Sequence, residues 1–482
     1  MIKKAVNTLH RVMLQIAENE SLFLFVAFLV LGVLPTDLLR WHQTEVALLE
    51  RYVVVPWGMA LCLLRLERRS SLTDSSLRVD LCVLALLLAW VTVPFGIRFG
   101  LTFNNICSWI SHCIVYFGIY AKLSEKDAAQ REKLFDQACM LFMLLALLLG
   151  GALLYCAAKG LSIGADVAAF RESGGTRGFG FGVFNRAYLC AGLHYNSTGI
   201  IALCTAAFCM AGLCRSRGVM RALYFAASAA MVAVVVLTQS RTARYAVMIA
   251  MAAGTYGYLS ANLRFSHAVV RHAAGMAAAA LVLVVSYAGA SMLTDAALSH
   301  YAKIENGGSA AIVAAARAEE SEKKEVKPKA ARAAVDATMS GRTDIWKNLF
   351  KLWKAEPKNL LIGNGIGRTG SRIVEGTMHE RNGAVAVHNT YLQHIADFGL
   401  IGFGMMCAFL LIIAVPALRV FYARGDRQIS GYRALCMLVV ACLMTGMMES
   451  APLGAMTPMN IVLFYAFALL TARGSDIKSC KA

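Results

Sequence analysis

The stretch ALYFAASAAMVAVVVLT occupies residues 222–238 and contains no charged side chain and no proline. With the few residues that precede it, a helix of this length crosses the roughly 30 Å hydrocarbon core of a bilayer. In lipid each backbone amide must be satisfied within its own segment, so a run this apolar has to be helical. The stretch therefore predicts a transmembrane helix.

Similar apolar runs recur along the chain of 482 residues, of which 58% are hydrophobic and only 16% are charged. A soluble protein of this size needs more charged surface to cover its core. The sequence therefore predicts an all-α polytopic membrane protein with about 12 transmembrane helices and one large loop that contains amphipathic helices. The expected spans are 20–40, 45–65, 80–97, 102–121, 136–158, 187–212, 219–238, 244–261, 272–294, 396–418, 431–450 and 455–472.

Basic residues give the chain a formal net charge of +18 and concentrate in the short connections between alternate spans. Connections rich in Lys and Arg face the cytoplasm, so both termini are expected there. This distribution also argues against nucleic acid as a partner and favours contact with anionic membrane lipids.

Two segments on the opposite side are much longer than the other connections. One is the glycine-rich segment 159–186, and the other runs over 295–395. Long loops are usually functional. We therefore divide the chain into helices 1–9 over 1–294, a large loop over 295–395, and helices 10–12 with a tail over 396–482.

Within the large loop, residues 308–340 are rich in Ala, Glu and Lys and are expected to be a variable charged insertion without chemistry. Residues 341–395 are the expected catalytic part. They begin with an amphipathic helix suited to the bilayer interface. Its apolar face is formed by Ile345, Trp346, Leu349, Phe350 and Trp353.

The fourteen cysteines fall almost entirely inside apolar runs, and none forms a C-x-x-C pair. Cysteine in this setting behaves as a small buried hydrophobe. The sequence therefore predicts neither a disulfide framework nor a zinc site, and we expect no metal and no cofactor.

Polar residues at the outer ends of spans are candidates for chemistry. Arg241 and Arg244 lie in TQSRTAR, residues 238–244, at the end of the seventh span. An arginine here is costly unless it faces a wet cavity or an anion, although snorkelling to the interface also explains Arg244. Arg342, which begins the amphipathic helix, is on local evidence a surface arginine.

The segment VHNTYLQH, residues 387–394, places His388 and Asn389 at the mouth of the tenth span. A histidine in this position can act as a general base near neutral pH. Other polar groups lie around the entry to the sixth span, where they face a cavity or form interhelical hydrogen bonds. They are Arg177, Arg186, His194 and Asn196.

Taken together, these motifs resemble the O-antigen ligase and O-antigen polymerase superfamily of bacterial envelope enzymes. Ser240-Arg241 matches the family's "SR". Arg342 to Trp346 matches its "R-x-x-x-W", and Gly363 to Gly367 the "G-x-G" turn that follows. His388-Asn389-Thr390-Tyr391-Leu392, followed by Gly399-Leu400-Ile401-Gly402, matches its "HN-x-Y/F-L…G-x-x-G". The resemblance covers about 190–472.

The resemblance implies a metal-independent glycosyl transfer at the periplasmic face of the bacterial inner membrane. The donor is a glycan on undecaprenyl pyrophosphate, and the acceptor is a sugar hydroxyl of lipid A–core in the ligase or another lipid-linked repeat in the polymerase. It implies that Arg241 and Arg342 stabilise the leaving diphosphate and that His388 is the base. Substrate-binding roles are expected for Arg244, Asn389, Arg368, Arg372, Arg186, Arg177, His194 and Asn196.

Direct attack by the acceptor inverts the anomeric carbon, whereas a covalent intermediate would need a carboxylate such as Asp397, Glu375 or Glu380. The ligase is favoured over the polymerase because the arginine–arginine–histidine set matches in type and order. A protein-directed oligosaccharyltransferase is a weaker alternative within the same chemistry. A transporter or lipid flippase is disfavoured because charges gather at span ends rather than near the midplane.

Overall fold

A computed structural model of the protein describes most of the predicted bundle. The expected spans 80–97 and 102–121 lie outside the described residues, apart from residue 119. The expected insertion 308–340 lies outside them but for Gly308. The described residues are 15, 18–33, 48–68, 119, 123, 126–163, 180–184, 188–192, 195–263, 267–308, 342–364, 387–424, 427–449 and 457–479.

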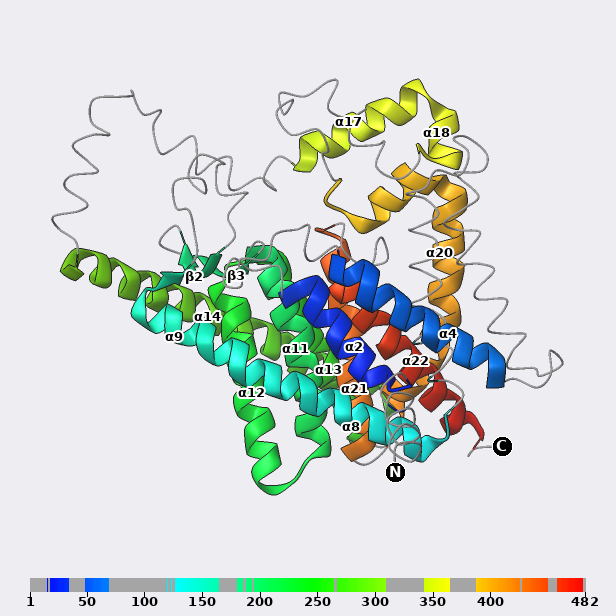
Figure 1. Ribbon diagram of the computed structural model, residues 1–482, viewed down its shortest axis with the longest axis horizontal. Helices are drawn as coiled ribbons and strands as arrows, with labels where there is room; N and C mark the ends of the chain where they lie inside the picture. Colours follow the sequence, from blue (N-terminus) through cyan, green and yellow to red (C-terminus); the bar gives the residue numbers. More distant parts are fainter. Residues whose placement is uncertain are drawn as a thin grey trace, which may run out of the picture.

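The described chain is a helical bundle. The helix that begins at Glu20 starts, and the helix that reaches Ser479 ends, at the end of the bundle opposite to α17 and α18 (Figure 1). Six of its helical segments are long and apolar enough to cross a membrane, which confirms an all-α polytopic membrane protein. These segments are Ala128–Lys159, Tyr195–Arg215, Gly218–Leu237, Ala268–Tyr301, Thr390–Tyr422 and Arg427–Gly446.

The bounds of the elements follow the apolar runs, with caps at several helix ends. The helices are α2 (Glu20–Phe28), α4 (Val55–Arg68), α8 (Ala128–Leu145), α9 (Gly151–Lys159), α11 (Tyr195–Arg215), α12 (Gly218–Leu237), α13 (Arg241–Asn262), α14 (Ala268–Gly308), α17 (Arg342–Ala355), α18 (Pro357–Ile362), α20 (Thr390–Tyr422), α21 (Arg427–Gly446) and α22 (Pro458–Ser479). Short π-helical turns extend α2, precede α4 and join α8 to α9.

Helix α22 forms the centre of the bundle. Its side chains from Met459 to Leu470 are almost completely buried, which is expected of a helix that is apolar on every face. It packs against α2, α11, α20 and α21. The Tyr465 hydroxyl lies 2.9 Å from Ser21 Oγ and 3.2 Å from the Leu134 carbonyl oxygen, so a polar contact joins three helices inside this core.

Helix α14 is the opposite case. Only 6% of the most apolar stretch of this helix is buried within the described chain, although its mean hydropathy of 2.0 equals that of α12. In a membrane protein such a surface is covered by lipid tails, so it carries no cost. The helix also continues to Gly308, beyond the expected end at 294.

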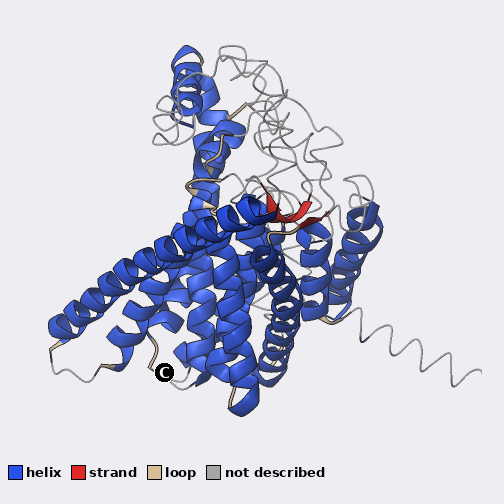
Figure 2. Cartoon of the chain, turned by 90° about the vertical axis from the view of Figure 1, so that its left-hand side faces the viewer, coloured by secondary structure: helices blue, strands red, loops and turns tan. Residues whose placement is uncertain are grey.

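A small antiparallel sheet precedes α11 and adds the only strands among the described residues. Its strands are β1 (Ser162–Ile163), β2 (Gly180–Phe184) and β3 (Tyr188–Gly192), in the order β1-β2-β3. Figure 2 shows them at the end of the bundle from which the helices α17 and α18 rise. The sixth span therefore begins at Tyr195 rather than at 187, because residues 188–192 pair with a glycine-containing strand.

Two glycines lock α18 onto α20. Helix α20 is kinked at Gly399, where φ is +70°, and a Cβ there would lie 2.1 Å from the Leu361 carbonyl oxygen. Gly363, with φ of +78°, faces the kink from the other side, where a Cβ would lie 2.3 Å from the Asp397 carbonyl oxygen. Only glycine permits both the positive φ and this approach of two backbones. The motif glycines therefore shape the backbone around the start of α20.

The apolar face predicted for α17 packs on protein. Leu349 and Trp353 are buried, and Ile345 and Trp346 are partly buried against α18 and the start of α20. Phe350 alone of that face is exposed, at 54%. The packing of α17 on α18 and on the start of α20 thus explains its amphipathic pattern.

The described cysteines are free, and most are buried. Burial raises the pKa of the Cys190 thiol in β3 to about 12, so this thiol stays protonated and unreactive.

Candidate functional site

His388 lies in a strained turn directly before α20. Its φ is +53°, a conformation that costs energy for any residue other than glycine. Such a conformation persists only where the surroundings hold it. The contacts made by its neighbours in sequence provide that support.

The residues after His388 are tied to the C-terminal end of α21. Asn389 Nδ2 donates to the Met447 carbonyl oxygen at 2.9 Å, and Thr390 Oγ1 donates to the Glu449 carbonyl oxygen at 2.7 Å. The Asn389 side chain also caps α20 by accepting from Leu392 N at 2.9 Å. These bonds fix where α20 begins and hold His388 at its mouth.

The residue before His388 is held from two other directions. Trp346 Nε1, on α17, donates to the Val387 carbonyl oxygen at 2.9 Å. Val387 N donates to Gln393 Oε1 at 3.0 Å, and Gln393 Nε2 in turn donates to Asp397 Oδ2 at 2.8 Å. Trp346 and Asp397 therefore both support the backbone of the His388 turn.

Glu449 joins His388 to α11. Its Oε2 lies 3.5 Å from His388 Nδ1, and its Oε1 accepts from Asn196 Nδ2 at 3.1 Å. The His388 side chain is 40% exposed, whereas that of Glu449 is 13% exposed. One carboxylate thus contacts the predicted base and a residue of the sixth span, and the imidazole is still open to a ligand.

A second strained turn precedes α13. Gln239 has φ of +54°, and it and His388 are the only non-glycine residues of positive φ in the part of the chain that the structure describes. Thr238 Oγ1 donates to the Val235 carbonyl oxygen at 2.7 Å, and Ser240 Oγ caps α13 by accepting from Ala243 N at 3.3 Å. Backbone strain of this kind clusters at functional sites.

The two arginines of this turn occupy the first turn of α13. Arg241 is its first residue and has an exposed side chain. The Arg244 guanidinium lies over the Tyr245 ring at 5.8 Å, and its buried Nε has no hydrogen-bond partner among the described residues. A helix N-terminus carries partial positive charge, so the turn and its arginines suit an anion.

The start of α11 brings the two strained turns to one place. Gly199 packs so closely on the second turn that a Cβ would lie 3.1 Å from Ser240 Cβ and 3.2 Å from Thr238 Oγ1. Asn196, about one helical turn earlier, holds Glu449 beside His388. The Ser240-Arg241 turn and the His388 turn therefore border the same end of one helix.

The other predicted site residues divide into two groups. Arg342 begins α17, although its side chain is not described. Asn389 and Asn196 lie beside His388, as given above. The remaining predicted residues lie outside the described part of the chain: Arg177, Arg186, His194, Arg368 and Arg372.

Glu449 was not predicted from the sequence, although a signal was present. It is the one charged residue between Arg433 and Arg473. An isolated acid in so apolar a stretch is costly unless it is paired or functional. Its position at the end of a span, rather than within one, hid this signal.

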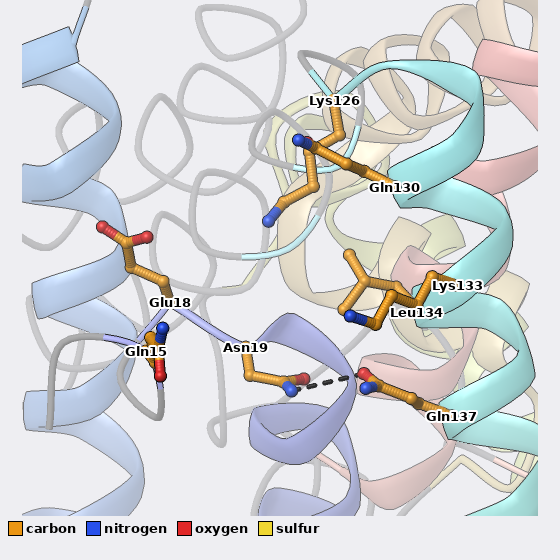
Figure 3. A pocket seen from close by; sticks show the side chains of 8 residues that line it. All are labelled: Gln15, Glu18, Asn19, Lys126, Gln130, Lys133, Leu134 and Gln137. Carbon is orange, nitrogen blue, oxygen red and sulfur yellow. Dashed lines mark hydrogen bonds between the residues drawn. The ribbon is translucent and has the colours of Figure 1, made fainter. Parts of the chain in front are cut away.

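A separate pocket of about 360 Å³ lies between the start of α2 and the first turns of α8 (Figure 3). Two lysines and four amide side chains contribute to its wall, and Asn19 Nδ2 donates to Gln137 Oε1 at 3.3 Å. None of its lining residues belongs to either strained turn. The lining residues are Gln15, Glu18, Asn19, Lys126, Gln130, Lys133, Leu134 and Gln137.

Comparison with protein families places the two strained turns in one known domain. The family described as O-antigen ligase matches residues 226–407, a range that includes Arg241, Arg342 and His388. No curated protein matches the chain. Over these residues the chain is similar to that family, whose members are glycosyltransferase-like enzymes acting on lipid-linked glycans.

Proposed function

We propose that this protein is an O-antigen ligase of the inner membrane. It transfers a glycan from undecaprenyl pyrophosphate to a sugar hydroxyl of lipid A–core at the periplasmic face. The observation that carries this proposal is that His388 and the Ser240-Arg241 turn, both inside the family match, border the same end of α11.

In the proposed reaction His388 is the general base. The acceptor hydroxyl transfers its proton to the imidazole while its oxygen attacks the anomeric carbon of the donor. The bond between that carbon and the pyrophosphate oxygen breaks, and undecaprenyl pyrophosphate leaves with the electron pair. The exposure of the imidazole supports access for an acceptor of this kind.

The arginines are proposed to stabilise the leaving pyrophosphate. Guanidinium groups bind phosphate through paired, charge-assisted hydrogen bonds. Arg241, at the N-terminus of α13, adds its charge to the positive end of a helix, and Arg244 lies one turn later. Arg342 completes the proposed set from the start of α17.

Direct displacement with inversion is proposed over a covalent intermediate. Asp397, one of the carboxylates considered for that role, is buried and accepts a hydrogen bond from Gln393. Its side chain thus supports the His388 turn from within the protein, which suits a structural role better than that of a nucleophile. Glu375 and Glu380 lie outside the described residues.

The proposed orientation places both termini in the cytoplasm. Helices α11, α20 and α22 end near Arg215, Arg424 and Arg473, and basic residues at these helix ends are what the positive-inside rule requires of a cytoplasmic face. The His388 and Ser240-Arg241 turns lie at the other ends of the helices concerned, so the same orientation makes the proposed active site periplasmic.

The test is transfer in vitro from an undecaprenyl-pyrophosphate glycan to purified lipid A–core, in chelator and without nucleotide. Wild-type protein should give product, and His388→Ala should lower the rate by about 10²-fold or more, the range for loss of a general base. Chain growth on lipid-linked repeats, without transfer to lipid A–core, would instead identify a polymerase. Full activity of a folded His388→Ala variant would refute the role of this histidine.

A further inference from the structure

Glu449 is a carboxylate in surroundings where a carboxylate is costly. No other charged residue lies between Arg433 and Arg473, and its side chain is only 13% exposed. An ionisable group near the membrane normally pairs with a partner or serves a function. Its carboxylate contacts Asn196 through one oxygen and His388 through the other.

Two hydrogen bonds fix the position of this carboxylate relative to His388. Asn196 Nδ2 holds Oε1 from α11, and the Glu449 backbone carbonyl accepts from Thr390 Oγ1, two residues after His388. The 3.5 Å between Oε2 and Nδ1 is at the long end of hydrogen-bond range, as catalytic contacts often are without substrate. Both partners of the contact are therefore held by bonds to other elements.

A carboxylate facing Nδ1 decides which nitrogen of a neutral imidazole carries the proton. The Nδ1–H group donates to the carboxylate, which leaves the lone pair on Nε2. When Nε2 takes up a proton, the same carboxylate stabilises the resulting imidazolium. The arrangement follows the logic by which an acid orients a catalytic histidine in other transferases and hydrolases.

We propose that Glu449 is the positioning residue for His388. It binds Nδ1 so that Nε2 accepts the proton of the attacking hydroxyl, and Asn196 holds its carboxylate in place. This assignment rests on the proposed function, because it presumes that His388 is the base.

The kinetic test is a double-variant cycle that combines changes at Glu449 and His388. Glu449→Leu should lower kcat by about 10²-fold with KM for the donor nearly unchanged, and Glu449→Asp should recover part of the loss. Asn196→Ala should produce a smaller loss of the same kind. In a His388→Gln background, Glu449→Leu should cause no further loss, since it acts through the imidazole.

The control is Asp295→Asn, which removes a negative charge from the exposed surface of α14 and should leave kcat unchanged. Additive losses in the His388→Gln background would overturn the assignment, as would a normal rate for Glu449→Leu. A glycan found covalently attached to Glu449 would also overturn it, because the residue would then be a nucleophile.

A readout independent of turnover separates this inference from the proposed function. Nitrogen NMR of ¹⁵N-histidine-labelled protein, with the His388 signals identified by their loss in His388→Gln, reports which ring nitrogen is protonated. Wild type should show the Nδ1–H form, and Glu449→Leu should shift the population toward Nε2–H. An unchanged tautomer would refute the inference even if the transfer reaction proves correct. The Nδ1–H form in a protein that fails to transfer would uphold the contact and refute the function.

Discussion

Different kinds of interaction stabilise the two ends of the helical bundle. At the end where α2 begins and α22 ends, called the terminal end below, ion pairs join helices: Arg215 contacts Glu132 at 2.6 Å and Asp136 at 2.7 Å, and Arg131 contacts Asp476 at 2.8 Å. At the other end, neutral donors such as Trp346 and Thr390 bind backbone carbonyls around His388. Ion pairs thus join helices at the first end, whereas neutral hydrogen bonds shape the backbone at the second.

The two kinds of interaction lead to different expectations for variants that affect folding and for variants that affect transfer. A neutral hydrogen bond to a strained backbone fixes geometry but contributes only about 1 kcal/mol. A partly buried ion pair that loses one partner costs more, because the remaining charge stays buried. Variants at the terminal end should therefore lower stability, and variants at the His388 end should lower activity.

The largest effect is expected at the backbone contact that shapes the His388 end. Gly399→Ala would bring a Cβ within 2.1 Å of the Leu361 carbonyl oxygen at a φ of +70°, so α18 must separate from α20. We expect loss of transfer together with a marked fall in thermal stability, measured by size-exclusion chromatography of heated protein in detergent. Gly404→Ala is the matched control, since its Cβ meets nothing within 4 Å. Equal stability and equal transfer rates for the two variants would show that the close approach of α18 to α20 at Gly399 is not needed.

At the terminal end, Arg215→Ala leaves Glu132 and Asp136 without their guanidinium partner. We expect a loss of about 3 kcal/mol, the lower end of the range for a buried pair, because Asp136 is largely exposed. The melting midpoint should fall by about 3 °C while kcat of the folded fraction is unchanged. Arg217→Ala, at an exposed position in the adjoining turn, should have little effect. A selective fall in kcat would show that the two ends are coupled.

Two tryptophans of α17 provide a sharper comparison within the His388 end. Trp346→Phe removes the donor to the Val387 carbonyl oxygen and should lower kcat by about tenfold, equivalent to roughly 1.4 kcal/mol. Trp353 has a buried Nε1 with no hydrogen-bond partner among the described residues. Trp353→Phe should therefore leave both kcat and stability nearly unchanged. Equal losses in steady-state transfer would mean that packing, rather than the hydrogen bond, supports the turn.

The smallest effect is expected at the cap of α13. Ser240→Ala removes the acceptor for Ala243 N and should cost about 1 kcal/mol of stability. Ser240→Asn supplies another capping oxygen and should recover most of this loss in a thermal melt. A failure of asparagine to recover it would assign the effect to the close packing of Ser240 on Gly199.

Several features of the protein followed directly from its sequence. Apolar runs such as 222–238 determined that the chain is a helical membrane protein, because lipid offers no hydrogen bonds to an unpaired backbone. The motif residues around Arg241, Arg342 and His388 indicated a resemblance to O-antigen ligases through their order and separations alone, and the family match over 226–407 includes all three. Their roles in catalysis stay predictions.

Other features depended on long-range contacts that no local pattern records. The apolar face of α17 predicted a site at the bilayer interface, but the same face also fits the protein surface formed by α18 and α20. The apolar residues of β3 predicted the start of a helix, because a partner strand leaves no mark on the segment it pairs with.

Composition and apolar runs were enough to predict the class of fold, and short ordered motifs were enough to indicate the similarity of residues 226–407 to O-antigen ligases. Only the tertiary structure shows that Glu449 contacts His388, which lies 61 positions earlier in the sequence. It also decided that Gly363 and Gly399 interlock, and that Gly199 brings the Ser240-Arg241 turn to the same end of α11. Such contacts arise where helices cross, and the free energy that fixes them belongs to packing between elements rather than to any one segment.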